Sequence, residues 1–130
     1  MKKLALIFVF IIFISCTDAN DETKIDETLA GEWVLTNVYC FCYFASDTDF
    51  SSHRLIFDVT KNKVTVVNET APDYFHEAGQ FSYNNQGNSI GLEDSSNAYT
   101  YQVEGSILTL SYVDEPMIAD DEVTYVYRRK

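Results

Sequence analysis

Short runs of alternating apolar and polar side chains decide which folds this sequence can adopt. In one of them, Leu55, Phe57 and Val59 are separated by Ile56 and Asp58. A period of two places the first set on one face of a β-strand. Such runs recur through the chain, and we count eight strands. They are expected at about 32–43, 54–59, 63–68, 80–83, 89–92, 99–104, 107–112 and 123–128.

The segments between these strands are mostly short and rich in turn residues, and none has the length of a crossover helix. Examples are the segments 60–62, 84–88 and 104–106. Asn and Gly tolerate a positive φ and so favour tight reversals. Sequential strands joined by hairpins favour an antiparallel meander, and closing it removes the exposed edges. The sequence therefore predicts an all-β fold, an eight-stranded antiparallel up-and-down barrel, with an open two-layer sandwich as the alternative.

A short N-terminal helical turn is expected just before the first strand, over residues 24–30. Thr23 or Asp26 can cap it, Leu29 is its apolar contact, and Gly31 ends it. Composition agrees with one small domain after this point. Without residues 1–15 the chain has 115 residues, enough for a single core.

The N-terminus has the layout of a secretory signal. Met1, Lys2 and Lys3 precede an apolar run at 4–14, which is too short to span a bilayer, because a spanning helix needs ~20 apolar residues. We predict a signal peptide at 1–15, an acidic tether at 16–25 and the barrel domain at 26–130. Ordinary cleavage near Ser15, which releases a soluble protein, is the alternative to the anchoring described next.

Phe13, Ile14, Ser15 and Cys16 resemble the cleavage box of bacterial lipoproteins, with Phe13 in place of the usual leucine. The resemblance implies that Cys16 becomes the first mature residue and carries fatty acyl chains, palmitate among them, which anchor the protein in a membrane. Several chains hold stably, since each buried methylene contributes ~0.8 kcal/mol. Thr17 instead of an aspartate implies the outer membrane. The acidic segment 18–22 resembles a surface-export signal or is simply a solvated linker, so surface and periplasmic orientations both stay open.

Charge excludes one class of partner. The full chain has a net charge of −11, and removal of 1–15 with Lys2 and Lys3 makes it −13. Such a surface repels polyanions, so we expect no nucleic acid as a partner. Docking on anionic lipid head groups is disfavoured by the same sign. The lipid at Cys16 is then the expected contact with the membrane.

Cysteines and histidines give few candidates for chemistry. Cys40 and Cys42 would lie on one face of a strand, ~6.6 Å apart, where a disulfide is strained. We therefore expect small buried packing residues there; a local or intermolecular disulfide and a metal site are the alternatives. His76, near two carboxylates, could act as a base but is expected to face water. An acidic loop at 114–122 could gather oxygen ligands for Ca²⁺ but matches no EF-hand.

No recognisable catalytic motif occurs: there is no nucleophile elbow, no phosphate loop and no nucleophile paired with a base at a known spacing. We therefore expect a protein that is not an enzyme and that uses no cofactor and no metal. A hydrolase or inhibitor built on the same barrel is the minor alternative.

Aromatic side chains are the best candidates for a binding site. Tyrosine can line a wall, since it buries its ring and offers a hydroxyl. If the barrel holds a pocket, nine aromatic residues are its expected lining: Trp33, Phe57, Phe81, Tyr83, Tyr99, Tyr101, Tyr112, Tyr125 and Tyr127. In a barrel of eight strands the same residues can instead fill the core, and we favour that reading. An interior cavity above ~300 Å³ would favour a carrier.

The start of the first strand, Gly31, Glu32 and Trp33, is similar to the Gly-x-Trp start of lipocalins. With the pair of strands at 101–110 and the arginine-ended last strand, the region 29–129 looks like the lipocalin-like domain of small bacterial lipoproteins. The resemblance implies that Trp33 plugs a closed end near Arg128 or Arg129. It also implies a membrane-anchored, non-catalytic protein that binds a small apolar ligand or a partner protein. The alternative is a structural or envelope-assembly component with a filled barrel.

Overall fold

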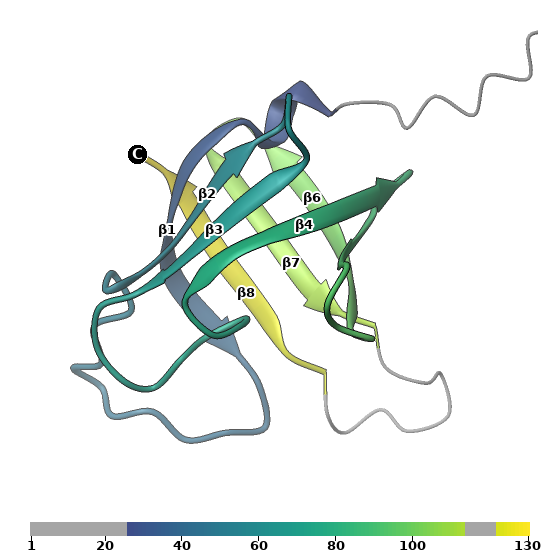
Figure 1. Cartoon of the computed structure of the whole chain (residues 1–130). Coiled ribbons are helices and arrows are strands. Elements are labelled where there is room, and N and C mark those ends of the chain that lie inside the picture. Colours follow the sequence, from purple (N-terminus) through teal and green to yellow (C-terminus); the bar gives the residue numbers. More distant parts are fainter. Residues whose placement is uncertain (1–25, 114–121) are drawn as a thin grey trace, which may run out of the picture.

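A computed structural model describes residues 26–113 and 122–130, which form a closed barrel of eight antiparallel strands in sequence order (Figure 1). The predicted fold class is confirmed, and within the described residues the only helical element is one 3₁₀ turn, η1. The bounds are η1 Glu27–Leu29, β1 Gly31–Tyr39, β2 His53–Asp58, β3 Lys63–Asn68, β4 Gly79–Gln86, β5 Ser89–Leu92, β6 Ala98–Glu104, β7 Ile107–Tyr112 and β8 Thr124–Arg129.

Strand β1 closes the barrel because it pairs with β2 on one side and with β8 on the other. Trp33 lies opposite Leu55 in β2 and opposite Arg129 in β8. The first and last strands of the chain therefore complete each other's hydrogen bonds. No edge is left open for pairing with another sheet.

The alternation that predicts the strands also decides what fills the barrel. In β2, Leu55 and Phe57 are buried while Ile56 is exposed. In β3, Val64 and Val66 are buried, and in β7 Leu108 and Leu110. The inward side chains of the strands, joined by a few residues outside them, form a single aliphatic and aromatic cluster inside the barrel.

Strand β1 is shorter than predicted, because it ends at Tyr39 and not near residue 43. A β-bulge at Thr36 shifts the register against β8, from Leu35 opposite Tyr127 to Asn37 opposite Val126. The Thr36 hydroxyl donates to the Val126 carbonyl over 2.9 Å. A bulge bends a strand and increases its twist. After it, Val38 packs against the core and the chain leaves the sheet at Cys40.

Strand β4 is longer than predicted. It continues through Asn84 and Asn85 to Gln86, which pair with β5, and only Gly87 and Asn88 form the reversal. Gly87 has φ +63° and no neighbouring atom where a Cβ would stand. The positive φ alone therefore explains a glycine at this tight turn.

The two ends of the barrel differ. The cap end carries η1 and the short reversals after β2, β4 and β6; the loop end carries the loops 40–52, 69–78 and 93–97 (Figure 1). Asp26, one of the two predicted capping residues, caps η1: its side chain accepts from the Thr28 amide at 3.0 Å, and Leu29 is fully buried. Residues 1–25, which hold the predicted leader and Cys16, lie outside the described residues.

Across residues 26–113 and 122–130, no helix has the length and hydropathy that a bilayer-spanning segment requires.

Candidate functional site

Trp33 and Arg129 seal the cap end. Trp33 is fully buried and its indole N–H donates to the Leu29 carbonyl over 2.8 Å. The Arg129 guanidinium lies 4.1 Å from the centre of the indole ring and donates to the carbonyls of Ala30 and, over 2.6 Å, Thr28. A cation over an indole face is attracted by the ring quadrupole. Of the two arginines named in the sequence analysis, Arg129 packs on Trp33, while Arg128 is exposed.

The nine aromatic residues predicted as pocket lining lie in or against the core. Trp33, Phe57, Tyr83, Tyr99, Tyr101 and Tyr127 belong to the buried cluster; Phe81, Tyr112 and Tyr125 are half-buried and pack against it. Their rings contact one another: Phe57 meets Tyr83 edge to face with centroids 5.3 Å apart. These side chains therefore contribute to the filling of the barrel. Ligand binding by any of them stays a prediction.

Loop 69–78 closes the loop end with two aromatic side chains. Tyr74 and Phe75 are buried, although neither is in a strand. The Phe75 ring lies 4.8 Å from that of Tyr99, whose hydroxyl donates to the Phe75 carbonyl over 3.4 Å. Phe75 has φ +63°, which is costly for a bulky side chain and persists only where its surroundings enforce it. Burial of the Phe75 ring explains how the loop keeps this conformation.

His53 is a buried polar residue that sequence reasoning did not single out. It is fully buried beside Tyr127, whose hydroxyl donates to Nε2 at 2.9 Å. The other ring nitrogen, Nδ1, donates to the Asn68 side-chain oxygen. Asn68 also donates to the His76 carbonyl at 2.9 Å and accepts from the Tyr74 amide at 3.4 Å. The network therefore ties loop 69–78 to strands β2, β3 and β8.

Burial sets the protonation of this network. It lowers the pKa of His53, and it raises the pKa of Tyr127 well above its usual value. Removal from water disfavours the charged form of each group. His53 and Tyr127 are therefore both neutral near pH 7, which fits a structural connection better than a proton-transfer site. The two-residue alternation could have revealed the burial of His53, because His53 is two residues before Leu55 and four before Phe57, which face inward.

A second polar contact fastens the cap end. The Tyr101 hydroxyl donates to Asp26 Oδ2 over 2.7 Å, and so joins β6 to the residue that caps η1. Burial, with this hydrogen bond, raises the pKa of Tyr101 to about 12. Tyr101 is among the residues predicted to line a pocket. Its hydroxyl instead contacts the chain itself, at Asp26 and, over 3.2 Å, at the Gly87 carbonyl.

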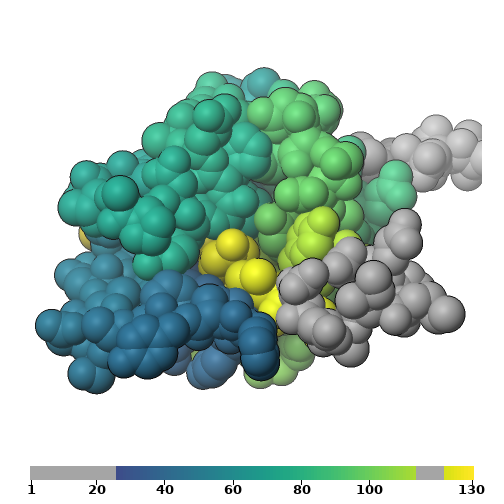
Figure 2. Space-filling model, turned by 90° about the horizontal axis from the view of Figure 1, so that it is seen from below, coloured from purple at the N-terminus to yellow at the C-terminus, as the bar shows by residue number. Residues whose placement is uncertain are grey.

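A cleft lies at the loop end and borders the core cluster at Tyr74 and Tyr125. It has a volume of about 450 Å³ and is formed by the end of β1, loop 40–52, loop 69–78 and the start of β8. Its walls are Val38, Cys40, Phe41, Cys42, Phe44, Pro72, Tyr74, Val123 and Tyr125. Figure 2 shows this end of the barrel, with the yellow C-terminal segment visible between the blue loop and the green part of the chain. Of the nine predicted lining residues, only Tyr125 borders this cleft.

Strongly exposed aromatic side chains lie in the chain segment that forms one wall of the cleft. Phe41 is 99% exposed and Tyr43 94%, and Tyr39 at the end of β1 is 59% exposed. On the inner side, the ring of Phe44 lies 5.2 Å from that of Phe50 and 6.3 Å from that of Tyr74. The cleft is therefore an apolar depression with an aromatic rim, a composition typical of ligand or partner sites.

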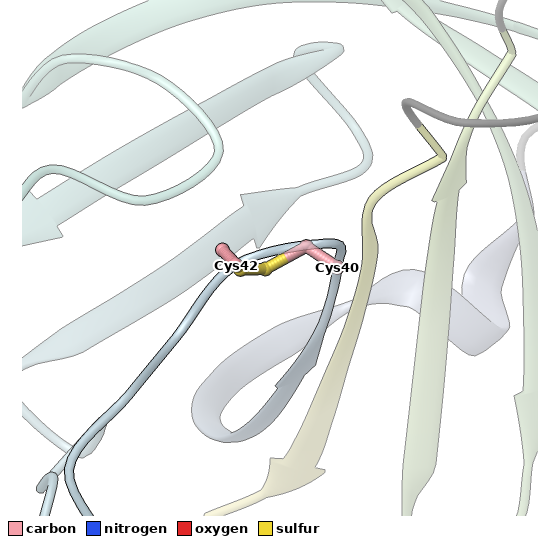
Figure 3. Close-up of a disulfide and its surroundings, with 2 residues drawn as sticks. All are labelled: Cys40 and Cys42. Atoms are coloured by element: carbon pink, nitrogen blue, oxygen red, sulfur yellow. A yellow bond between two sulfur atoms is a disulfide. The ribbon is translucent and has the colours of Figure 1, made fainter.

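Cys40 and Cys42 form a disulfide on the wall of this cleft, with Cα atoms 5.1 Å apart (Figure 3). The expectation that they are small buried packing residues on a strand is wrong. The strand ends at Tyr39, Cys40 is half-buried and Cys42 is exposed. The bend after the strand brings the two side chains together, which the regular spacing of a strand would not. A disulfide was one of the two alternatives that the sequence left open for this pair.

His76 was predicted to face water, and the structure shows it to be more enclosed than that. It is half-buried, its ring lies 4.3 Å from that of Phe81, and its Nε2 is 3.8 Å from Asp94. Asp94 belongs to loop 93–97, so His76 links two loops at this end. Among residues 26–113 and 122–130, no three His, Cys, Asp or Glu side chains gather as a metal site would require. Most of the acidic loop considered for Ca²⁺, residues 114–121, lies outside the described residues.

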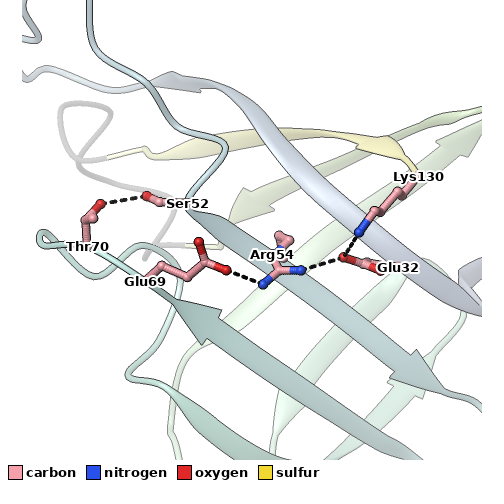
Figure 4. Close-up of polar contacts among 6 residues, drawn as sticks. All are labelled: Glu32, Ser52, Arg54, Glu69, Thr70 and Lys130. Carbon is pink, nitrogen blue, oxygen red and sulfur yellow. Dashed lines mark hydrogen bonds and ion pairs between the residues drawn. The ribbon is translucent and has the colours of Figure 1, made fainter.

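Charged side chains cross the outer wall of β1, β2 and β3 (Figure 4). Glu32 accepts from Arg54 at 2.9 Å and from Lys130 at 3.1 Å, and Arg54 also pairs with Glu69. The hydrogen bond from Arg54 lowers the pKa of Glu32. These contacts are solvent-facing and connect the strands that close the barrel; they belong to the wall and not to the cleft.

Comparison with known proteins does not assign the chain: no protein-family model matches it, and no curated protein matches it significantly.

Proposed function

We propose that the chain is a non-catalytic lipoprotein with a lipocalin-like domain, anchored in the outer membrane through Cys16, that binds a small apolar molecule at the loop end. The observation that carries the binding proposal is the apolar cleft of about 450 Å³ beside Tyr125 and Phe44. Small-molecule sites are typically 300–1,000 Å³ and mainly apolar. The proposed site is this cleft, whose walls come from the ends of β1 and β8 and from loops 40–52 and 69–78.

Charge narrows the ligand class. The chain has a net charge of −11, and the cleft walls in the described structure carry no Asp, Glu, Lys or Arg side chain. A surface of this sign repels anions at long range, and the walls offer no ion partner inside. A neutral molecule with aromatic or aliphatic surface therefore fits better than a fatty acid or a phosphate.

The binding proposal can be tested with Nile red, a neutral dye that fluoresces when it leaves water. We expect saturable binding by the purified protein. Val123→Trp places an indole in the cleft without removing a core contact, and we expect at least about tenfold weaker binding, the loss of ~1.4 kcal/mol. Ile107→Trp is the matched control, since Ile107 is 40% exposed at the start of β7 and far from the cleft walls. Equal binding by both variants would contradict the proposal.

Native mass spectrometry of the protein purified from its envelope would look for the natural ligand. A bound neutral molecule in the wild type that is absent from Val123→Trp would support the cleft as its site. Repeated absence of any ligand, together with no dye binding, would reject the carrier function.

The anchor is proposed from the leader and Cys16 alone. Metabolic labelling with a clickable fatty acid should mark the wild type and should not mark Cys16→Ala. Equal labelling of the two proteins, or none in the wild type, would contradict the anchor. Protease treatment of intact cells then separates the two orientations, because a surface protein is digested and a periplasmic one is protected.

A second candidate function is a structural or envelope-assembly component that contacts a partner protein through its loops. The observation that favours it is the exposure of Phe41 and Tyr43 beside a filled barrel. Interfaces are enriched in such aromatic residues. A photo-crosslinking amino acid at position 41 in intact cells should then give one discrete adduct, and the same residue at position 107 should give none. Absence of an adduct at position 41 would reject this alternative.

A further inference from the structure

The Cys40–Cys42 disulfide is placed where an incoming thiol can reach it. Cys42 is exposed, Cys40 is half-buried at the end of β1, and both border the cleft. Figure 3 shows the bridge across the bend that follows the end of β1. Exposed disulfides are the labile ones, since thiol exchange requires access to a sulfur.

A structural role explains this bridge poorly. A disulfide stabilises by restricting the unfolded chain, and the effect grows with the length of the loop it closes. Here the two cysteines are separated by one residue, Phe41, so the bridge restrains almost nothing beyond its own bend. Phe41 is 99% exposed and holds no core contact in place. The bridge does not connect two parts of the barrel.

We infer that Cys40 and Cys42 form a thiol–disulfide exchange site, which accepts peptide segments that carry a cysteine pair next to apolar side chains. This activity goes beyond the proposed non-catalytic binding of a small molecule, because it adds a chemical step at the same cleft. The cleft walls supply Phe44, Tyr74 and Tyr125 as contacts for the apolar part of the peptide. An unfolded or incompletely oxidised protein outside the cytoplasm presents such segments.

The chemistry balances without another reactant. A peptide thiolate attacks the Cys42 sulfur, which forms a mixed disulfide and releases the Cys40 sulfur as a thiolate that takes up a proton. The second peptide thiolate attacks the peptide sulfur of the mixed disulfide and releases Cys42. The peptide is oxidised by two electrons, and the Cys40–Cys42 disulfide is reduced to two thiols. A second turnover requires a disulfide oxidant such as oxidised glutathione.

Access decides the order of these steps. Cys42 is the more exposed of the two residues, so it is the electrophile, and Cys40 is the leaving group. The attacking species is the thiolate, and the rate should therefore rise with pH up to the pKa of the peptide thiol.

The test uses the full chain with Cys16→Ser, which removes the third cysteine, and two synthetic dithiol peptides. One carries Phe and Leu beside its cysteines, and the other carries Ser in their place. Peptide oxidation and protein thiols are followed by mass spectrometry after acid quenching. We expect the apolar peptide to be oxidised about tenfold faster than the polar one. Cys40→Ser/Cys42→Ser should oxidise neither, and Cys40→Ser alone should trap a mixed disulfide at Cys42 when the peptide is supplied in its oxidised form.

Val123→Trp separates exchange at the cleft from simple exposure of a disulfide. With the indole in the cleft, the apolar peptide should be oxidised no faster than the polar one. Dithiothreitol should still reduce the Cys40–Cys42 disulfide at the wild-type rate. Equal rates for the two peptides in the wild type, or a disulfide that neither peptide reduces in the folded protein, would overturn the inference. Nile red binding in the same preparation is an independent measurement. It tests the small-molecule proposal alone, whatever the result of the exchange assay.

Discussion

The two ends of the barrel are built from similar residues and differ in what those residues do. At the cap end the two apolar side chains that close the barrel are enclosed: Trp33 and Leu29 are fully buried, and Arg129 covers the indole. At the loop end Tyr74 and Phe75 also turn inward, yet Phe41 and Tyr43 are left almost fully exposed beside a cleft. At the cap end, side chains of the protein cover the apolar core. At the loop end, the described residues leave apolar surface in contact with water.

We expect the side chains of the cap end to contribute mainly to stability and those around the cleft mainly to binding. A side chain that is enclosed on all sides contributes to folding and can accept no further contact. A side chain that stays in water contributes little to folding and can be used in binding. Substitutions at the cap end should therefore change the free energy of unfolding, and those at the rim of the cleft should change binding or exchange.

The largest expected effect is at Trp33. Trp33→Ala should lower the free energy of unfolding by ~3–5 kcal/mol, because it leaves a cavity and removes the surface on which Arg129 rests. Urea denaturation followed by circular dichroism measures it. Phe41→Ala is the control from the loop end and should change stability by less than ~0.5 kcal/mol. A similar loss in the two variants would remove the contrast between the ends.

His53 should make the loop end sensitive to acid. Its pKa is lowered in the folded protein, so the unfolded chain binds the proton more readily. Stability is then present above the unfolded pKa of ~6.5 and is lost as the pH falls through the folded value, with a slope of up to ~1.4 kcal/mol per pH unit. Urea denaturation between pH 7 and 5 tests this. The titratable groups packed near the imidazole are Tyr127 and Tyr74, with Asp73 close by.

His53→Gln is the matched variant, since it keeps a hydrogen-bonding side chain that does not titrate in this range. We expect it to be less stable than the wild type at pH 7 and to have a flatter pH dependence. An unchanged slope in His53→Gln would show that another group causes the acid effect.

Tyr101→Phe should have an intermediate effect at the cap end. Loss of the hydrogen bond to Asp26 should cost ~1 kcal/mol at neutral pH. The Tyr101 pKa of about 12 lies above the ordinary value of 10.0, so the wild type should lose stability as the pH rises from 10 toward 12. Absorbance near 295 nm reports the ionisation. Tyr99, also raised to about 12, titrates in the same range, so the difference between wild type and variant is the readout.

Glu32→Gln should have the smallest effect. The contacts of Glu32 with Arg54 and Lys130 are solvent-facing, and ion pairs in contact with water contribute little to stability. The difference from the wild type should shrink further in 1 M salt, where charges are screened. Thermal unfolding at two salt concentrations is sufficient. A loss as large as that of Trp33→Ala would mean that the outer wall, and not the enclosed cap end, holds the barrel closed.

The barrel could be predicted from the sequence because its determinants are local. Alternation as in Leu55 and Phe57 marks the inward face, and Gly105 with φ +59° marks a reversal that needs no long-range information. The bulge at Thr36 could not be predicted in this way, since it depends on the register between β1 and β8, 90 residues apart. The predicted length of β1 was wrong for the same reason, and the position of Cys40 and Cys42 with it.

The candidate site was less predictable than the fold. Aromatic strand residues such as Tyr83 and Tyr99 have the composition of a pocket, but a periodicity of two says only that they face inward and not whether space remains between them. The cleft is made largely by loop residues such as Phe44 and Pro72, whose positions depend on contacts far along the chain. His53 had the right phase to be buried, but its partners Asn68 and Tyr127 come from two other strands.

We have proposed that the loop-end cleft, and not the barrel interior, binds an apolar molecule. A two-dimensional NMR titration of the ¹⁵N-labelled protein with Nile red locates the bound dye. We expect shifts of the amide signals of Val38, Phe44 and Tyr125, with the indole N–H signal of Trp33 unmoved. Shifts centred on Trp33 and Leu108 with the cleft unaffected, or no shift at saturating dye, would contradict it.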